Sequence, residues 1–193
     1  MENQGFVKST IVQTLSVKTI VAIGIGTALF FLLARFASIP VFANTTVTFQ
    51  YALLAFFAVM FGPIAGMLIG FVGHVLTDIS FGWGLWWSWI IVSGIIGFGF
   101  GIIMRNIKAS EGEFLGAKAV IQFVVLTTVV HLVAWGVIAP VLDILIYAQP
   151  VERVFTQGLI AAAGNSVTTA VVGTLLLLAY SKAIPKTGSL KKD

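Results

Sequence analysis

The pattern of apolar and polar positions along the chain predicts helices that cross a membrane. Apolar runs recur at nearly the length of about 20 residues that a helix needs to cross a hydrocarbon layer of about 30 Å. These runs lack the strict alternation over about ten residues that is typical of a membrane β-strand. We therefore expect an all-α membrane protein in which six helices form one compact bundle. The predicted spans are residues 19–37, 47–62, 63–79, 86–104, 117–139 and 155–180.

The boundary between the second and third spans depends on the sequence Phe61-Gly62-Pro63. Without a break there, the two runs would form one helix of about 30 residues, roughly 45 Å long, which exceeds an ordinary bilayer. Proline is disfavoured inside a helix but is favoured in its first turn. We therefore predict two short spans that meet at this sequence.

Composition supports a membrane protein of one domain. The chain has 193 residues, of which 59% are hydrophobic and 9% charged, and its mean hydropathy is +1.06. Ordinary soluble domains are about 25% charged. We interpret residues 1–193 as a single transmembrane domain, with residues 1–18 as a cytoplasmic lead-in and residues 181–193 as a basic cytoplasmic tail. The chain has no cysteine, which excludes a disulfide framework and a thiolate metal site.

The basic residues orient the predicted spans. Six spans place both termini on one side, and with that side in the cytoplasm nine basic residues lie inside and two, Arg35 and Arg153, outside. This distribution agrees with the positive-inside rule. A five-span alternative with Met1 outside gives eight against three, so helix length rather than charge favours six spans. We expect both the N- and the C-terminus in the cytoplasm.

Polar side chains gather in the outer half of the predicted bundle. His74 and Asp78 are four residues apart and share one face of the third span. This face continues inward through Gly66 and Gly70, and small residues at such spacing are typical of close helix packing. The His74–Asp78 pair is therefore expected to point into the bundle rather than into lipid.

Three further spans or loops place polar groups at a similar level, which predicts a cavity that opens to the outside. These residues are His131 and Trp135 in the fifth span, Asn165 in the sixth, and Asn44 in the first outer loop. Ionisable groups within a membrane are functional by default. A structural pair at the interface remains an alternative for His74 and Asp78, a bond to a neighbouring helix for His131, and an interhelical contact for Asn165.

All five tryptophans fall on the predicted outer side, whereas an interfacial aromatic belt places indoles at both rims. Indole faces stack on flat heteroaromatic rings and on cations. We name Trp83, Trp86 and Trp87 as candidate ligand contacts, with a simple belt as the alternative.

The sequence lacks the motifs of common catalytic centres. It has no P-loop, no H-E-x-x-H and no G-x-S-x-G, and the His74–Asp78 pair offers too few ligands for a metal site. We therefore predict that the protein is not an enzyme. A membrane protein that binds a solute fits better, and it would need an ion gradient or an energised partner.

Two stretches resemble the HmpT-type S components of energy-coupling factor (ECF) vitamin transporters. They are "IPVFANTTVTFQYALLAFFAVMFGPIAGMLIGFVGHVLTD" at 39–78 and "GWGLWWSWIIVSGIIG" at 82–97, and the resemblance extends over nearly the whole chain. It implies a subunit that captures a vitamin or precursor from outside, under a lid formed by the first outer loop. For this type the ligand would be hydroxymethylpyrimidine or a pyridoxine-like compound.

The resemblance also implies partners and a location. The loaded S component would dock on a transmembrane T protein (EcfT) and two ABC-type ATPases (EcfA and EcfA') in the bacterial plasma membrane. ATP and Mg²⁺ would bind those ATPases, and this chain would hold no cofactor. The family's docking motif, A-x-x-x-A in the first span, has two counterparts here with glycine substituted. These counterparts are Ala22-x-x-x-Gly26 and Gly24-x-x-x-Ala28.

Two other classes of function stay open at this stage. In a self-sufficient ion-coupled carrier, His74, Asp78 and His131 would be the protonatable groups. In a structural or assembly subunit, the polar residues would only hold helices together.

Overall fold

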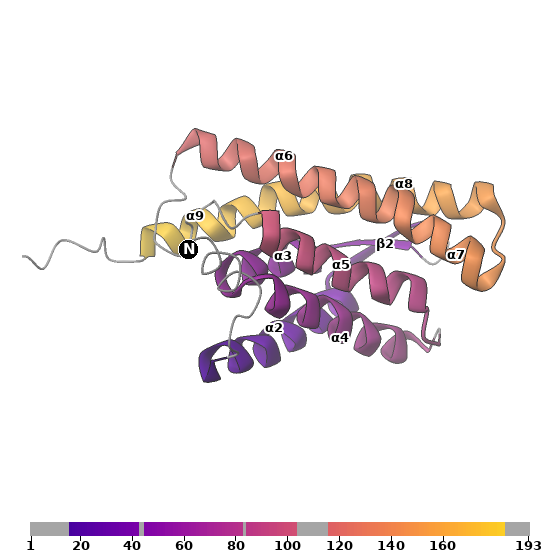
Figure 1. The fold of residues 1–193 in the computed structure, drawn as a ribbon, viewed down its shortest axis with the longest axis horizontal. Coiled ribbons are helices and arrows are strands. Elements are labelled where there is room, and N and C mark those ends of the chain that lie inside the picture. The colour runs from indigo at the N-terminus through magenta and orange to yellow at the C-terminus, as the bar shows by residue number, and fades with distance from the viewer. Residues whose placement is uncertain (1–15, 43–44, 83, 104–115, 184–193) are drawn as a thin grey trace, which may run out of the picture.

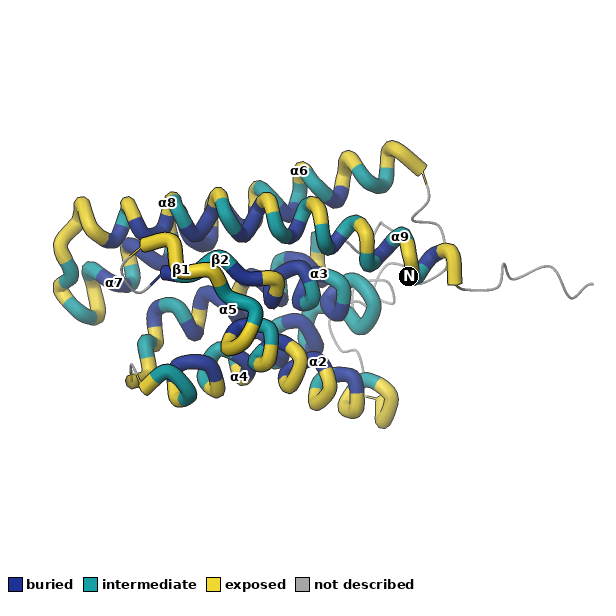
Figure 2. The backbone as a smooth tube through the Cα atoms, turned by 180° about the vertical axis from the view of Figure 1, so that it is seen from behind, coloured by how far each residue is buried: buried dark blue, intermediate teal, exposed yellow. Residues whose placement is uncertain are grey.

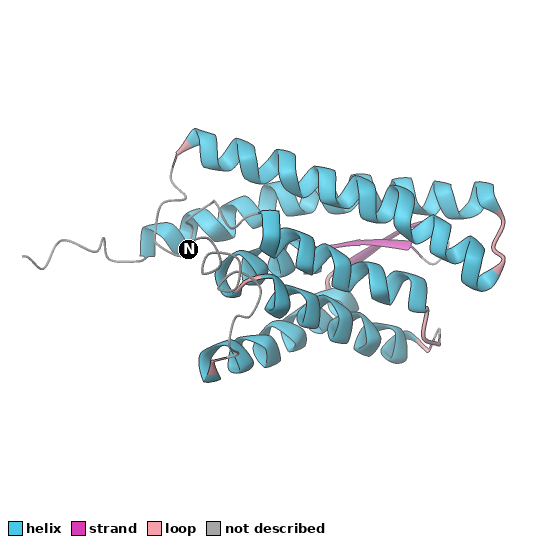
Figure 3. Ribbon diagram, in the orientation of Figure 1, coloured by secondary structure: helices cyan, strands magenta, loops and turns pink. Residues whose placement is uncertain are grey.

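A computed structural model of the chain describes residues 16–42, 45–82, 84–103 and 116–183. The first half forms a helix, a β-hairpin and three further helices (Figures 1 and 3). These elements are α2 (Val17–Phe36), β1 (Ser38–Phe42), β2 (Thr45–Thr48), α3 (Gln50–Phe61), α4 (Pro63–Phe81) and α5 (Trp87–Ile103).

The second half forms two long helices, each interrupted by one π-helical segment. The first comprises α6 (Ala117–Val133), η3 (Ala134–Ile138) and α7 (Ala139–Tyr147). The second comprises α8 (Val151–Thr168), η4 (Thr169–Gly173) and α9 (Thr174–Ala183). Figure 1 shows the two long helices side by side, with α2, α4 and α5 beneath them.

Within the described residues, four helices have the length and apolar character of a membrane span: Val17–Phe36, Pro63–Phe81, Ala117–Tyr147 and Val151–Ala183. The predicted second and fourth spans correspond to apolar helices of 12 and 17 residues. At a rise of about 1.5 Å per residue the shorter of these is roughly 18 Å long. The count of six spanning helices and the orientation of the bundle stay predictions.

The short helix α3 lies at the centre of the bundle. It packs against α2, α4 and α5 on one side and against η4 and α8 on the other. Its residues Tyr51, Leu54 and Ala58 are at most 2% exposed, and Figure 2 shows the buried positions of all helices turned toward this interior. The core therefore surrounds α3, and the exposed apolar side chains face outward.

Glycines bring α4 and α5 into backbone contact. A Cβ atom at Gly66 would collide with the carbonyl oxygen of Gly97, and one at Gly70 would collide with that of Ser93. The prediction that Gly66 and Gly70 mark a close helix contact is thus confirmed, and the partner is α5. This contact places His74, one turn beyond Gly70, beside the N-terminal half of α5.

The β-hairpin was not predicted from the sequence. Strands β1 and β2 pair antiparallel, with Ser38 opposite Thr48 and Ile39 opposite Val47, and an irregularity follows Pro40. Pro40 tolerates an edge position because an edge strand needs no donor on its outer side. Helix α3 consequently begins at Gln50, three residues later than the predicted span.

The fifth predicted span ends at residue 139, whereas its helix continues to Tyr147. Pro140 lies in the first turn of α7, directly after the π-helical segment η3. A proline inside a helix lacks the N–H and clashes with the carbonyl four residues before it. The wider π-helical turn provides room for the ring, so the helix passes through Pro140 and carries Asp143 with it.

Candidate functional site

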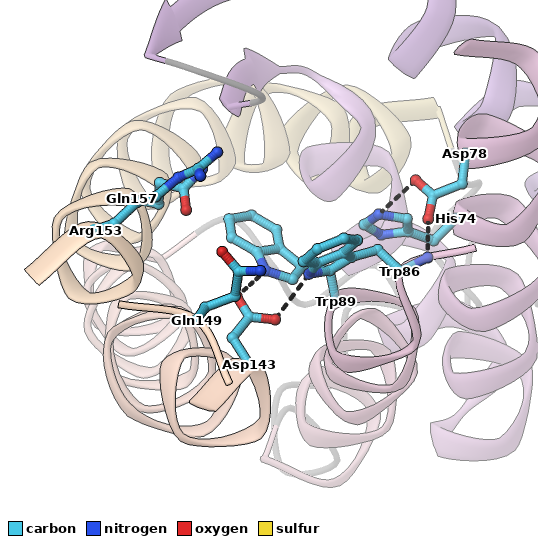
Figure 4. Close-up of a pocket in the computed structure, with 8 residues that line it drawn as sticks. All are labelled: His74, Asp78, Trp86, Trp89, Asp143, Gln149, Arg153 and Gln157. Atoms are coloured by element: carbon cyan, nitrogen blue, oxygen red, sulfur yellow. Dashed lines mark hydrogen bonds and ion pairs between the residues drawn. The ribbon is translucent and has the colours of Figure 1, made fainter. Parts of the chain in front are cut away.

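A cavity of about 240 Å³ lies between α4, α5, α7 and α8, at the end of the bundle where α4 turns into α5 and α7 turns into α8 (Figure 4). Charged, amide and indole side chains line it. The lining residues are His74, Asp78, Trp86, Trp89, Asp143, Gln149, Arg153 and Gln157.

His74 is held from both sides of its ring. Its Nδ1 atom lies 2.5 Å from the hydroxyl of Ser93, and its Nε2 atom lies 3.5 Å from Oδ1 of Asp78. The hydroxyl of Ser93 also lies 2.8 Å from the hydroxyl of Tyr51. A hydrogen-bonded series therefore runs from the cavity wall into the core at α3.

Asp78 fixes the turn between α4 and α5. The residue is 2% exposed, and its Oδ2 atom accepts the backbone N–H of Trp86 at 2.9 Å. Trp86 directly precedes α5, so this carboxylate satisfies one of the N–H groups that a helix start leaves without a partner. A negative charge at a helix N-terminus is also favoured by the helix dipole. The His74–Asp78 stripe points into the bundle, as the sequence predicts.

Asp143 on α7 gathers three donors from the start of α5. Its Oδ1 atom accepts the indole N–H of Trp86 at 2.8 Å and the hydroxyl of Ser88, and its Oδ2 atom accepts the indole N–H of Trp89 at 2.8 Å. The residue is 2% exposed. A buried carboxylate is costly unless it is hydrogen-bonded, and here both oxygens are satisfied.

Aromatic rings pack in two groups beside the cavity. Trp86 stacks on Tyr147 with ring centroids 4.3 Å apart, and Trp89 meets Trp135 at 4.8 Å. Trp135 in turn meets Tyr51 edge to face at 5.6 Å. The cavity itself is lined by the rings of Trp86 and Trp89, whose indole N–H groups are bound by Asp143.

Three predicted site residues lie buried in the core, outside the lining of the cavity. His131 is fully buried, and its Nε2 atom lies 3.0 Å from the hydroxyl of Thr169. Trp135 and Asn165 are 1% and 2% exposed. Within the described part of the chain, Nε1 of Trp135 and Oδ1 of Asn165 have no hydrogen-bond partner. A buried polar atom without a partner calls for an explanation.

The remaining predicted contacts are Trp87, Trp83 and Asn44. Trp87 is 43% exposed, its ring lies near that of Phe71, and it does not line the cavity. Trp83 and Asn44 lie outside the described residues. The structure thus brings His74, Asp78 and Trp86 together at the cavity.

Sequence reasoning did not select five of the lining residues: Trp89, Asp143, Gln149, Arg153 and Gln157. A signal existed for Asp143, which is the only acidic residue in the apolar run "APVLDILIY". Because the fifth span was ended at residue 139, this carboxylate was assigned to an outer loop. Its helical position, and with it the contact to the tryptophans, could not be recognised.

The predicted docking motif is divided between two faces of α2. Gly26 is buried, and a Cβ atom there would crowd Ile69 of α4 and Phe57 of α3. Ala22, one turn earlier, is 6% exposed. Gly24 and Ala28 are exposed, and no atom lies within 4 Å of a Cβ placed at Gly24. The Ala22–Gly26 half of the motif packs inside this chain, so only the Gly24–Ala28 half remains accessible to a partner.

The geometry favours binding over catalysis. Ser93, His74 and Asp78 form a serine–histidine–carboxylate series, but Ser93 is 0% exposed and its hydroxyl is shared with Tyr51. A nucleophile must reach its substrate. Among the described residues no group of three or more His, Cys, Asp or Glu side chains could hold a metal ion. The arrangement offers stacking faces, hydrogen-bonding edges and an exposed Arg153 at the rim.

Comparisons with known proteins agree with this description. The family model of the "ECF-type riboflavin transporter, S component" matches residues 14–182. A UPF0397 protein of Exiguobacterium sp. is 50% identical over 94% of this chain and 99% of its own length. UPF0397 proteins of Enterococcus faecalis and Lacticaseibacillus casei are 48% and 44% identical over 94% of this chain, covering 99% and 97% of their own lengths.

The fold is similar to a solved structure, "Crystal structure of FolT bound with folic acid". The TM-score is 0.62 at 15% sequence identity, over 84% of this chain and 98% of that one. At this identity the likeness establishes the fold. The predicted S-component architecture is therefore confirmed at the level of the fold.

Proposed function

This chain belongs to the S components of ECF-type riboflavin transporters, and we propose that it captures a small, flat heteroaromatic vitamin or vitamin precursor in the cavity beside Trp86 and Trp89. Hydroxymethylpyrimidine and pyridoxine-like compounds are the ligands that we propose. The observation that carries this proposal is the pairing of indole faces with hydrogen-bonding groups at one end of an S-component fold.

The size of the cavity favours a single-ring ligand. Its volume of about 240 Å³ lies below the range of roughly 300–1,000 Å³ that is usual for pockets of drug-sized ligands. Riboflavin, after which the family is named, has three fused rings, and folic acid, the ligand of the FolT structure, is larger still. A pyrimidine or pyridine ring with hydroxymethyl groups would fit in this cavity beside the tryptophans without a large rearrangement.

The polar groups suit such a ligand. Ring nitrogens and hydroxyl groups need a few well-placed donors and acceptors, while most of the contact area is apolar. The imidazole of His74 and the amide of Gln149 can serve the hydroxymethyl and ring-nitrogen positions. Stacking on Trp86 or Trp89 would supply the rest of the affinity.

A binding experiment on the purified protein tests the proposal. Titration with hydroxymethylpyrimidine or with pyridoxine should quench tryptophan fluorescence at sub-micromolar concentration, because two indoles line the cavity. Riboflavin and folic acid, added as competitors, should displace these ligands poorly. If no B vitamin or precursor changed the fluorescence, the proposal would be overturned. If riboflavin bound more tightly than hydroxymethylpyrimidine and pyridoxine, riboflavin would be the ligand in their place.

We further propose that the loaded protein docks on a transmembrane T protein and two ABC-type ATPases in the plasma membrane. The exposed small residues Gly24 and Ala28 support a docking face on α2, because missing side-chain bulk lets another helix approach closely. Co-expression of the chain with such a module, followed by purification through a tag on the T protein, tests this proposal. Failure of the chain to co-purify would overturn it.

A further inference from the structure

We infer that Asp143 is a positioning residue of the ligand site: its carboxylate sets the orientation of the two indoles that wall the cavity and thereby sets the affinity for flat ligands. This inference rests on the function proposed above for the same cavity. It assigns to Asp143 a role that acts through Trp86 and Trp89 rather than through direct contact with the ligand.

Three hydrogen bonds converge on the carboxylate of Asp143. Asp143 accepts from Trp86 Nε1 and Trp89 Nε1, each at 2.8 Å (Figure 4). It also accepts from Ser88 Oγ. An indole has a single polar atom, so the bond to Nε1 fixes the rotation of the ring about its side-chain torsions. Both tryptophans of the cavity wall are thus held by the same group.

The chemistry of a carboxylate suits an acceptor of three donors. An ionised carboxylate only accepts, and its two oxygens offer about four lone-pair sites, enough for three donors. An amide in the same place would turn an NH₂ group toward one of the N–H or O–H donors. Hydrogen bonds to a charged acceptor are also shorter and stronger than neutral ones. A carboxylate is therefore the side chain that can hold two indoles at once.

The contact between α7 and the start of α5 continues beyond Asp143. Tyr147 lies one turn after Asp143, on the same helix face. Its ring stacks on that of Trp86 at 4.3 Å, and its hydroxyl accepts the backbone N–H of Trp87 at 2.8 Å. The face of α7 that carries Asp143 and Tyr147 thus fixes Trp86 at its edge and at one ring face.

Trp86 is held at two points by two carboxylates. Asp78 accepts its backbone N–H at 2.9 Å, and Asp143 accepts its indole N–H. The first bond fixes the position of the Trp86 backbone. The second bond fixes the direction in which its indole ring points. The exposed face of the wall is then determined before a ligand arrives, which reduces the ordering cost of binding.

The variant Asp143→Asn tests the inference, with Glu152→Gln as a matched control. Glu152 is an exposed carboxylate on α8 that does not line the cavity. We expect Asp143→Asn to change the near-ultraviolet circular dichroism of the ligand-free protein and to make its indoles more accessible to acrylamide. We also expect it to raise the Kd for hydroxymethylpyrimidine or pyridoxine, measured by calorimetry, by about tenfold. Glu152→Gln should leave all of these unchanged.

A double-mutant cycle with Trp89→Phe separates positioning from direct contact. Trp89→Phe keeps a flat ring but removes the N–H that Asp143 accepts. If Asp143 acts through the tryptophans, the two changes together should raise the Kd little more than Asp143→Asn alone. If the increases in Kd caused by the two single changes multiply in the double variant, the two residues act independently and the inference is overturned. The inference is also overturned if Asp143→Asn changes neither the indole spectrum nor the Kd.

Failure of the proposed function and failure of the inference on Asp143 give different results. If the unaltered protein binds no ligand, the proposed function fails, whereas the dichroism and acrylamide measurements still decide whether Asp143 orients the indoles. If Asp143→Asn does not fold, Ser88→Ala removes one donor and leaves the carboxylate in place. A change in the near-ultraviolet dichroism and in the acrylamide accessibility of the indoles with Ser88→Ala would then support the inference, and no change in either measurement would overturn it.

Discussion

The side chain of Val47 occupies the space that Gly164 leaves open on α8. A Cβ atom at Gly164 would collide with a methyl group of Val47, which belongs to strand β2 of the hairpin. Through this contact the hairpin packs on α8, the helix that also carries the cavity residues Arg153 and Gln157. If the first outer loop is the lid of the ligand site, as the family resemblance implies, the lid packs on α8 at Gly164.

Gly164→Ala should therefore loosen the hairpin and speed up the release of ligand. Overpacking of this kind costs about 1–3 kcal/mol. If that cost falls on the closed state alone, dissociation becomes roughly 5- to 150-fold faster. Stopped-flow fluorescence with hydroxymethylpyrimidine measures the rate. Gly136→Ala is the control, because the nearest atom to a Cβ there lies 3.8 Å away. Equal rates in both variants would contradict a closing role of the hairpin.

Asn165→Leu should separate ligand affinity from stability. The Oδ1 atom of Asn165 is buried and has no hydrogen-bond partner among the described residues. An unpartnered buried polar group costs about 1–3 kcal/mol, so an apolar side chain of similar size should leave the thermal midpoint unchanged or raise it. If the amide contacts the ligand, the Kd rises by roughly tenfold as one hydrogen bond is lost.

The matched comparison for Asn165→Leu is His131→Leu. The Nε2 atom of His131 lies 3.0 Å from the hydroxyl of Thr169, so its replacement leaves that buried hydroxyl without this partner and should lower the thermal midpoint. If Asn165→Leu leaves the Kd unchanged, Asn165 does not contact the ligand, and the alternative of an interhelical contact holds.

The sequence predicted the bundle because its strongest signal is apolar length. Uninterrupted apolar runs indicate helices that face lipid or core, and the Gly-Pro pair correctly separated α3 from α4 at residues 62 and 63. The i, i+4 spacing of His74 and Asp78 correctly placed both on the inward face. These inferences depend only on local periodicity.

What the sequence could not indicate depends on local exceptions and on register between helices. The predicted fifth span ended at residue 139, but a π-helical turn accommodates Pro140 and the helix continues to Tyr147, and therefore Asp143 was missed. The hairpin contains Pro40 and only a few alternating residues, too short a pattern to predict a strand. The burial of Trp135 beside Trp89 follows from the packing of two segments 46 residues apart in the chain, which one sequence does not reveal.

Gly70→Ala should destabilise the protein and weaken ligand binding together. The added methyl group would collide with the carbonyl oxygen of Ser93 and push α4 away from α5. Because Ser93 also holds His74, the separation moves a residue of the cavity. We expect a loss of about 1–3 kcal/mol in the free energy of unfolding, detected as a lower thermal midpoint in detergent.

The control for Gly70→Ala is Gly94→Ala on α5. The nearest atom to a Cβ at Gly94, the Cβ of Phe71, lies 3.4 Å away, so the substitution should be tolerated in both stability and binding. A Gly70→Ala protein as stable as Gly94→Ala would show that the two backbones do not approach as closely as described.

The divided motif on α2 makes a prediction about docking that distinguishes its two halves. Gly24→Leu and Ala28→Leu add bulk to an exposed surface, so the protein should fold and bind ligand normally but no longer co-purify with the T protein and its ATPases. Gly26→Leu places the same bulk against Ile69 and Phe57, and overpacking should lower the stability by about 1–3 kcal/mol or more. The thermal midpoint of the isolated protein and its recovery with the tagged T protein measure the two effects. Normal docking by both Gly24→Leu and Ala28→Leu would move the partner surface away from this face of α2, because a helix cannot approach closely over two added leucine side chains.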